Sequence, residues 1–244
     1  MNERSPWWYQ LRGLIFGIVY LVGFVAGPAL WSLAGRPYAS TASWAGSAFG
    51  TQGESAAFGV AVLCTLICWV LRTWGSAYLN ADVVWNANAI TDALIVQGPF
   101  RHTRSPLYLG NMFMALGVGA LATPCGFGII VLGSAAFILL LVRYETEGLQ
   151  ARYGSVVTAY VKSVPALLWR ITPVTLQDSG HVAPSLAQGL RSEIFTGCVF
   201  LAMLTLWVFG NRAFPAFGAL LAAGWIAQHL TTTRLPSGVT PPGQ

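Results

Sequence analysis

Long apolar stretches without charge alternate with short polar ones along this chain. The first stretch runs from about Gly13 to Gly35, and the second covers about Ser55 to Leu71. About 20 predominantly apolar residues suffice to cross the hydrocarbon core of a bilayer as a helix. Both stretches are therefore predicted to be membrane-spanning helices, and the second is expected to continue as helix through Arg72 towards Leu79.

A third uncharged stretch is too long for a single span. It extends over 38 residues, 105–142. As one helix it would measure about 57 Å, nearly twice the roughly 30 Å of the hydrocarbon core. The sequence Thr-Pro-Cys-Gly at 123–126 lies in its middle, and Pro followed by Gly interrupts helices. We predict a tight hairpin of two helices, over Leu107–Leu121 and Phe127–Tyr144.

Two more apolar stretches, Ile194–Gly210 and Ala213–Leu230, follow near the end of the chain. The expected fold is therefore an all-α integral membrane protein with about six transmembrane helices, one pair of which forms the tight hairpin. The expected segments are an N-terminal anchor helix with an outer loop at 1–54, a three-span core at 55–170, a cytoplasmic linker at 171–193, a C-terminal transmembrane hairpin at 194–232 and a disordered tail at 233–244.

The basic residues indicate the orientation, because Lys and Arg are enriched in cytoplasmic loops. With the N-terminus in the cytoplasm, only Arg36 and Arg212 of the thirteen Lys and Arg residues face outwards. The eleven on or near the cytoplasmic side are Arg4, Arg12, Arg72, Arg101, Arg104, Arg143, Arg152, Lys162, Arg170, Arg191 and Arg234. We therefore predict a multi-pass protein of the cytoplasmic membrane with both termini in the cytoplasm. The polar segments Asn80–Arg104 and Glu145–Glu193 are then cytoplasmic too.

Composition and charge agree with a membrane protein. Hydrophobic residues make up 55% of the chain and charged residues 9%, and the mean hydropathy is +0.61. Soluble proteins carry roughly 25% charged residues, so a soluble enzyme, a disordered chain and a nucleic-acid-binding module are excluded despite the net charge of +5. The four cysteines and three histidines are dispersed, and no metal is predicted. Gly13/Gly17 and Gly23/Gly27 have a spacing that permits close helix packing, although among 27 glycines such pairs arise by chance.

Cations crowd together just before the first helix of the predicted hairpin. Gly98-Pro99 predicts a turn, and Arg101, His102 and Arg104 follow it. Cations at the start of a helix oppose its dipole. They are better explained if they meet an anion, which could be a carboxylate, a phosphate or Glu145. The alternative is ordinary anchoring of a span by cytoplasmic positive charge.

Glu145 is the candidate carboxylate at the other end of the hairpin. Both ends of a tight hairpin lie on one membrane face, which brings this residue beside Arg104. Glu145 and Leu149 share a helix face, whereas Glu147 points about 200° away. We predict that Glu145 faces the mouth of the bundle. There it either takes part in chemistry or forms a salt bridge with Arg104 that only closes the hairpin.

These two motifs, in this order and spacing, resemble the isoprenylcysteine carboxyl methyltransferase and phospholipid methyltransferase family. The sequence Gly-Pro-Phe-Arg-x-x-Arg-Ser-Pro-Leu-Tyr-Leu-Gly at 98–110 is similar to that family's G-P-[YF]-R-x-x-R-[HN]-P-x-Y-x-G. Its acidic pair and the tyrosine-containing segment after it are matched by Glu145, Leu149, Tyr153-Gly154, Tyr160 and Val164-Pro165. With Leu71-Arg72 and Trp74 upstream, the resemblance covers about Val60 to Trp169. The last two predicted spans lie outside it.

The resemblance implies methyl transfer from S-adenosylmethionine to a membrane-soluble acceptor at the cytosolic face of the membrane. The acceptor would be isoprenylcysteine carboxylate-like or a lipid headgroup. By similarity Glu145 would receive the amino group of the cofactor, and Arg104 would orient its carboxylate or an anionic acceptor. The implied cofactor-binding residues are Gly98, Pro99, Phe100, Arg101, Tyr108 and Glu145, and the implied catalytic residues are Arg104 and Glu145. Expected partners are the acceptor and the lipid bilayer, and a second copy of the chain is a candidate partner; no nucleic acid and no metal are expected.

The match has three departures, and other functions stay open. Ser105 replaces the family's usual histidine, Thr146 replaces the second acid, and Val157 replaces a tyrosine. One alternative is an NADPH-dependent lipid or sterol reductase on a similar scaffold, although Leu107 and Asn111 differ from the asparagine and the acid found there. Another is a non-catalytic membrane protein that retains the scaffold. A transporter is disfavoured, because no predicted span carries an ionisable residue deep in the membrane.

Overall fold

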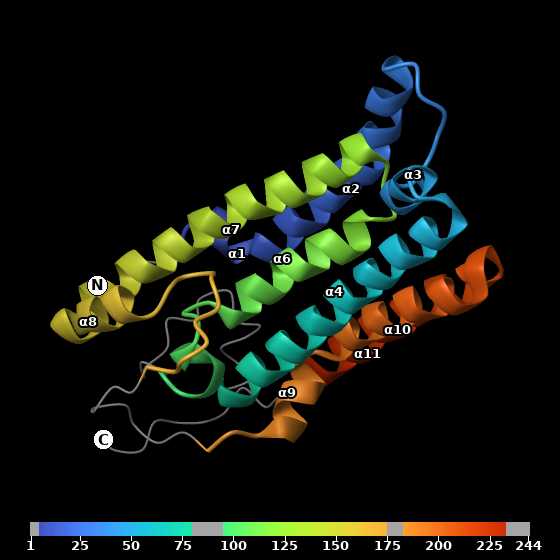
Figure 1. Cartoon of the computed structure of the whole chain (residues 1–244). Coiled ribbons are helices and arrows are strands. Elements are labelled where there is room, and N and C mark those ends of the chain that lie inside the picture. The colour runs from blue at the N-terminus through green and yellow to red at the C-terminus, as the bar shows by residue number, and fades with distance from the viewer. Residues whose placement is uncertain (1–4, 80–94, 175–182, 233–244) are drawn as a thin grey trace.

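The computed structural model of the chain describes residues 5–79, 95–174 and 183–232. In these ranges every regular element is a helix and no strand occurs. The helices are α1 (Trp7–Gln10), α2 (Arg12–Leu33), α3 (Thr41–Ser47), α4 (Gly50–Tyr78), η1 (Gly98–Arg101), α6 (Pro106–Gly119), α7 (Pro124–Tyr153), α8 (Ser155–Ser163), α9 (Leu186–Ser192), α10 (Ile194–Phe209), η2 (Gly210–Ala213) and α11 (Phe214–Thr232). Most of the predicted cytoplasmic segment 80–104 and the predicted tail 233–244 lie outside the described residues. Figure 1 shows the arrangement.

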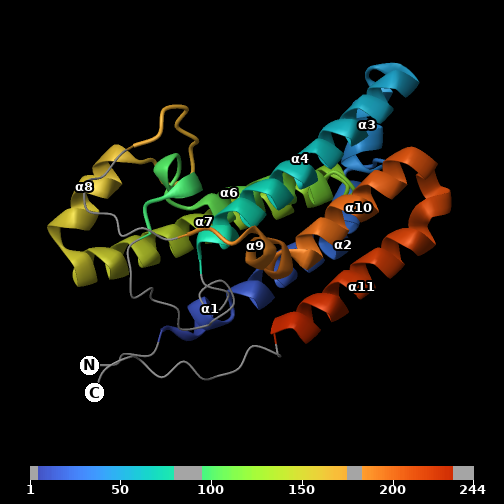
Figure 2. The same ribbon diagram turned by 90° about the horizontal axis from the view of Figure 1, so that it is seen from below.

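Four stretches of helix are long and apolar enough to cross a membrane. They are Arg12–Leu33, Gln52–Tyr78, Pro124–Tyr153 and Ile194–Thr231. The last stretch is divided at η2, where Gly210 adopts a φ of 60° and the chain turns back, so that α10 and α11 pack as a hairpin (Figure 2). An all-helical, multi-pass membrane protein is thus confirmed. Each of the six predicted spans contains a helix, but α6 has only 14 residues.

The predicted tight hairpin is confirmed as the pair α6 and α7. Its turn ends at Thr123, whose Oγ1 accepts a hydrogen bond from the backbone N–H of Gly126 at 3.4 Å. Pro124 occupies the first turn of α7, where its missing N–H leaves no helix bond unmade. For this reason α7 begins three residues before the predicted Phe127. It also continues to Tyr153, well past the predicted end at Tyr144.

The predicted outer loop at 36–54 is instead largely helical. Ser40 caps α3 by accepting a hydrogen bond from the N–H of Ser43 at 3.1 Å. The backbone N–H and the hydroxyl of Thr41 both donate to the carbonyl of Ala122, at 2.7 and 2.9 Å. The start of α3 therefore packs on the α6–α7 turn, and α4 begins at Gly50 rather than at Ser55. The prediction that the second span continues as helix through Arg72 towards Leu79 is confirmed, since α4 ends at Tyr78.

The glycine pair in the second half of α2 is a packing contact. A Cβ atom placed on Gly27 would lie 2.5 Å from the Cα of Gly126 in α7, and one on Gly23 would lie 2.9 Å from the Gly126 carbonyl oxygen. Gly13 and Gly17 meet nothing within 4 Å. Small residues let helix backbones approach closely, so of the two glycine pairs it is the one at 23 and 27 that lets α2 approach α7.

We expect Gly27→Ala to lower the free energy of unfolding by about 1–3 kcal/mol, because the added methyl group cannot fit without moving α2 away from α7. Gly17→Ala provides a matched control on the same helix and is expected to leave the stability unchanged or slightly raised. Denaturation of the purified protein in mixed micelles measures both. Equal stability of the two variants would show that α2 is not held at this contact.

The long helices form a row that curls around a cavity. Consecutive neighbours in the row are α2, α7, α6, α4, α10 and α11, which pack on one another in this order (Figure 1). The largest apolar cluster joins α4, α6 and the C-terminal hairpin around Ala61, Val199 and Met203. Because residues from both end helices of the row, α2 and α11, line the same cavity, the bundle encloses a space instead of a solid core.

Candidate functional site

The cavity has a volume of about 910 Å³ and is lined by residues of α1, α2, α4, η1, α6, α7, α8, α9, α10 and α11. Sites for drug-sized ligands have roughly 300–1,000 Å³, so this cavity is at the large end of that range. One face of α6 runs along it, since Tyr108, Asn111, Met114 and Val118 recur at helical spacing and all line the cavity. That face is polar towards the N-terminus of α6 and apolar towards its C-terminus.

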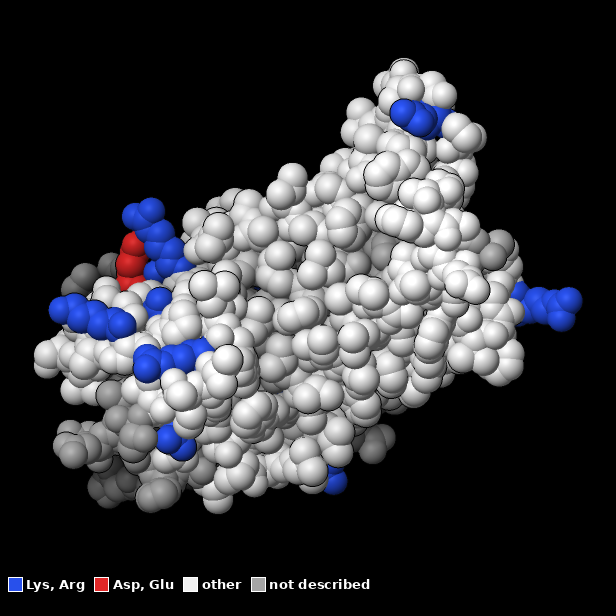
Figure 3. Space-filling model, viewed as in Figure 1, with Lys and Arg blue, Asp and Glu red and all other residues white. Residues whose placement is uncertain are grey.

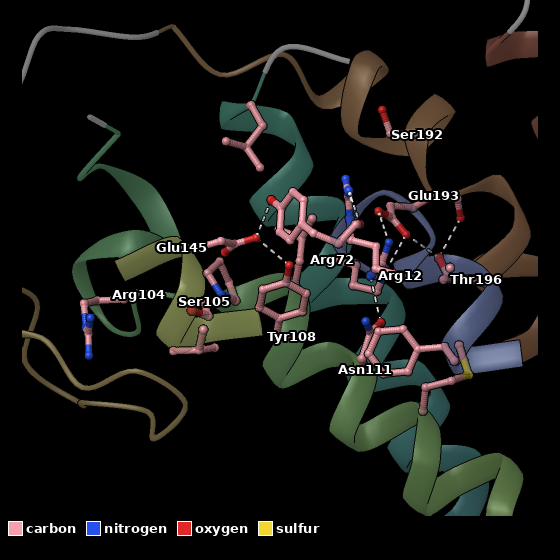
Figure 4. A pocket seen from close by; sticks show the side chains of 18 of the residues that line it. Arg12, Arg72, Arg104, Ser105, Tyr108, Asn111, Glu145, Ser192, Glu193 and Thr196 are labelled. Atoms are coloured by element: carbon pink, nitrogen blue, oxygen red, sulfur yellow. Dashed lines mark hydrogen bonds and ion pairs between the residues drawn. The ribbon is translucent and has the colours of Figure 1, made fainter. Parts of the chain in front are cut away.

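Glu145 lies on the cavity wall and is held by two tyrosines. Its Oε1 accepts hydrogen bonds from the hydroxyl of Tyr108 at 2.6 Å and from that of Tyr9 at 2.8 Å (Figure 4). Burial, and secondarily the Glu145 carboxylate, raise the pKa of Tyr9, so its hydroxyl stays protonated and a donor. Arg12 also lines the cavity, lies 4.7 Å over the Tyr9 ring and interacts electrostatically with Glu145. In the described part of the chain Glu145 forms no salt bridge, so its carboxylate is held by hydrogen bonds and not by direct contact with a cation.

Arg104 lies beside the end of α7 but does not contact Glu145. Its Nη1 donates to Thr146 Oγ1 at 3.1 Å and its Nε donates to the carbonyl of Val164 at 3.0 Å. Figure 4 shows its guanidinium turned away from the Glu145 carboxylate. The proximity expected from the hairpin is confirmed, whereas the salt bridge that we considered as an alternative is absent. Arg104 instead donates a hydrogen bond to Thr146, one of the residues at which this sequence differs from the motif of the methyltransferase family.

The two sequence motifs meet in space. The backbone N–H of Arg104 donates to the carbonyl of Pro165 at 2.9 Å, and that of Ser105 donates to the carbonyl of Ala166 at 3.2 Å. The hydroxyl of Tyr160 donates to the carbonyl of Phe100 at 2.7 Å. These bonds attach the segment before α6 to the end of α8, so the resemblance in sequence corresponds to one continuous piece of structure.

The predicted cofactor-binding segment forms the short helix η1. Gly98 begins it with a φ of 56°, as a turn at this glycine requires. Phe100 lines the cavity, as do Arg104, Tyr108 and Glu145, whereas Gly98, Pro99 and Arg101 are not part of its wall. Arg101 instead donates through Nε to the carbonyl of Val174 at 2.9 Å. The structure thus brings four of the seven predicted site residues to one cavity.

Glu147 points away from the cavity, as its helical position predicts. It forms an ion pair with Arg143 at 2.8 Å, in which the two side chains are 61% and 80% exposed. An exposed pair four residues apart on a helix contributes little to stability. The prediction that Glu145, and not Glu147, faces the bundle is therefore confirmed.

A buried ion pair on the opposite wall of the cavity was missed from the sequence. Arg72 of α4 makes a bidentate contact with Glu193 at the start of α10, with Nε–Oε2 at 2.6 Å and Nη2–Oε1 at 2.9 Å. The two side chains are 12% and 0% exposed. Further hydrogen bonds to Glu193 come from the hydroxyls of Ser76 at 3.0 Å and Thr196 at 2.9 Å. Every side-chain oxygen of Glu193 is therefore satisfied.

The arginine of this pair also binds Asn111. Its Nη1 donates to Asn111 Oδ1 at 2.7 Å (Figure 4). The sequence predicts no ionisable residue deep within a span, since it places Arg72 at the cytoplasmic end of its helix. The structure shows instead that Arg72 lies six residues before the end of α4, inside the apolar stretch Gln52–Tyr78, and is buried. An arginine within such a stretch is usually paired with a carboxylate. The position of Arg72 in the sequence could therefore have indicated that a buried ion pair exists.

No protein-family model, curated protein or solved structure matches this chain significantly. The likeness to the methyltransferase family therefore rests on the two sequence motifs alone. Among the described residues, no group of three or more His, Cys, Asp or Glu side chains could hold a metal ion.

Proposed function

We propose that this chain is an S-adenosylmethionine-dependent membrane methyltransferase acting on a membrane-soluble acceptor. The observation that carries the proposal is the carboxylate of Glu145, which faces a large cavity, accepts two tyrosine hydroxyls on one oxygen and forms no salt bridge in the described part of the chain. A buried charge is costly unless it is paired. A cationic ligand in the cavity would supply a partner in direct contact.

The donors present fit this cofactor. Because Tyr9 and Tyr108 both occupy Oε1, the other carboxylate oxygen is available to the ammonium of the cofactor's amino-acid portion. The rings of Tyr9 and Tyr144, which line the cavity with Glu145, pack at a centroid distance of 4.9 Å, and aromatic faces attract cations. When bound, the cofactor would supply a methyl group activated by a positively charged sulfur.

The chain itself would contribute position and a dry environment. Methyl transfer to a nucleophile that already carries its lone pair depends mainly on alignment and removal of water. Tyr9 and Tyr108 fix the carboxylate that binds the cofactor. Arg104, through its bond to Thr146, fixes the turn of α7 that bears Glu145. Direct contact of Arg104 with a carboxylate of the cofactor or acceptor stays a prediction, as does the contribution of Gly98, Pro99 and Arg101.

The proposal includes six membrane crossings with both termini and the polar end of the cavity on the cytoplasmic side. Figure 3 supports this orientation, since Lys and Arg gather at the end of the molecule that carries α8 and are sparse elsewhere on that face. Arg36 follows α2 and Arg212 lies between α10 and α11, both at the opposite end. Such an asymmetry marks the cytoplasmic side. The acceptor, isoprenylcysteine carboxylate-like or a lipid headgroup, would enter from the bilayer.

Calorimetric titration of the detergent-purified protein with S-adenosylhomocysteine and, separately, with NADPH tests the proposal. We expect binding of S-adenosylhomocysteine and no heat from NADPH. Binding of NADPH alone would favour the reductase that the sequence left open. Absence of binding for both ligands would favour a scaffold without this chemistry.

A further inference from the structure

Asn111 presents an oriented hydrogen-bond donor to the interior of the cavity. An arginine can only donate hydrogen bonds, so the atom of Asn111 that contacts Arg72 must be the carbonyl oxygen. The amide nitrogen therefore faces the other way. It has no hydrogen-bond partner in the described part of the chain, and Asn111 lines the cavity (Figure 4). The contact with Arg72 thus orients the two amide N–H groups of Asn111 towards the cavity, where they can donate hydrogen bonds to a ligand.

The position of Asn111 along α6 relates this donor to the Glu145 site. Tyr108, which binds Glu145, precedes Asn111 by three residues, or about 4.5 Å along the helix axis. Met114 and Val118 continue the same face for about 10 Å beyond Asn111. The donor therefore lies between the proposed cofactor end and an apolar limb of the cavity.

The apolar limb is formed with the C-terminal hairpin. Met114 and Val118 of α6 face Val199 of α10 and Phe217 and Leu221 of α11, all of which line the cavity and pack in one hydrophobic cluster. These side chains offer no hydrogen-bonding groups, so this limb suits a hydrocarbon chain.

The cavity also contains a hydroxyl group. Tyr20 of α2 lines the cavity and packs against the cluster of Ala115, Ala122 and Ile130, and its hydroxyl makes no hydrogen bond in the described part of the chain. The charge of Arg72 is matched by Glu193. The donors that Asn111 and Tyr20 present are neutral dipoles, which suit an uncharged carbonyl or hydroxyl oxygen.

From this arrangement we infer that Asn111 binds a carbonyl or hydroxyl oxygen at the polar end of the methyl acceptor, a single-chain amphiphile whose hydrocarbon body lies along α10 and α11. The inference rests on the proposed function for the role of the ligand as acceptor. It assigns acceptor selection to Asn111 and to the hairpin at 194–232, which lies outside the region resembling the methyltransferase family.

Two probes of equal carbon number, 2-tridecanone and tridecane, separate the oxygen contact from hydrocarbon packing. Apparent affinities follow from the thermal midpoint of the protein in phosphatidylcholine nanodiscs as the mole fraction of each probe is raised. We expect wild type to bind the ketone about tenfold more tightly, the effect of one buried hydrogen bond. Equal affinities would overturn the inference.

Asn111→Asp is the diagnostic variant, because its carboxylate still accepts from Arg72 but provides no N–H. The second carboxylate beside Glu193 should lower its midpoint without probe, and the ketone preference, measured against tridecane in the same variant, should be lost. Asn211→Asp, at an exposed position in η2, is the matched control and should keep the preference. If Asn111→Asp keeps it too, Asn111 is not the donor and the inference fails.

The outcome can be distinguished from that of the proposed function. A ketone preference in a protein that does not bind S-adenosylhomocysteine would support the oxygen site and contradict methyl transfer. Binding of S-adenosylhomocysteine without a ketone preference would support the methyltransferase and overturn the inference about Asn111.

Discussion

Replacing Glu145 with Gln is expected to lower the affinity for S-adenosylhomocysteine by about a hundredfold, because the bound ammonium would lose its buried counter-charge. The amide preserves shape and can still accept hydrogen bonds from Tyr9 and Tyr108, so the fold should be kept. Calorimetric titration of the variant in detergent measures the loss, and its thermal midpoint reports whether it is folded.

Glu147→Gln is the matched control for this prediction. It removes the same charge two residues away, from an exposed pair with Arg143 on the outer face of α7. Its affinity should equal that of wild type. An equal loss in both variants would mean that the overall negative charge of this helix end, and not the placement of Glu145 in the cavity, governs binding.

Arg72→Met is expected to produce the largest loss of stability, about 3–5 kcal/mol, because it leaves the fully buried Glu193 without its cation. The double variant Arg72→Met/Glu193→Met should recover most of this loss, since a hydrophobic pair avoids the desolvation of two charges. Denaturation in mixed micelles provides the free energies of unfolding.

Arg143→Met supplies the comparison for an exposed pair. Its effect should stay below about 1 kcal/mol, because water already solvates both partners. If Arg72→Met and Arg143→Met lose equal amounts, or if the double variant is no more stable than Arg72→Met alone, the buried pair does not stabilise the fold in the way its geometry indicates.

The sequence predicted the helices well because a bilayer imposes length and hydropathy on each one. The turn at 123–126 followed from proline and glycine, and the direction of Glu145 followed from helical periodicity. These are local properties. The helix over Thr41–Ser47 was missed because its small polar residues resemble a loop, and its start is fixed by contacts with a turn some 80 residues away.

The side-chain partnerships could not be predicted in the same way. Tyr9 and Glu145 are 136 residues apart, and Arg72 and Glu193 are 121 apart. Which side chains meet depends on how each helix is rotated in the bundle. Helices that are apolar on nearly all sides provide no clear face from which to infer that rotation. A charged residue within such a helix indicates that a partner exists, but not which one.

The short length of α6 has a consequence for where chemistry would occur. Its 14 residues rise only about 21 Å, whereas the hydrocarbon layer is about 30 Å thick. On the proposed orientation, and with the α6–α7 turn at the outer surface, Tyr108 and Asn111 would lie below the cytoplasmic surface, within the cytoplasmic leaflet. A lipid acceptor would reach the site by diffusing within the bilayer, whereas the water-soluble cofactor would have to enter the cavity from the cytoplasm.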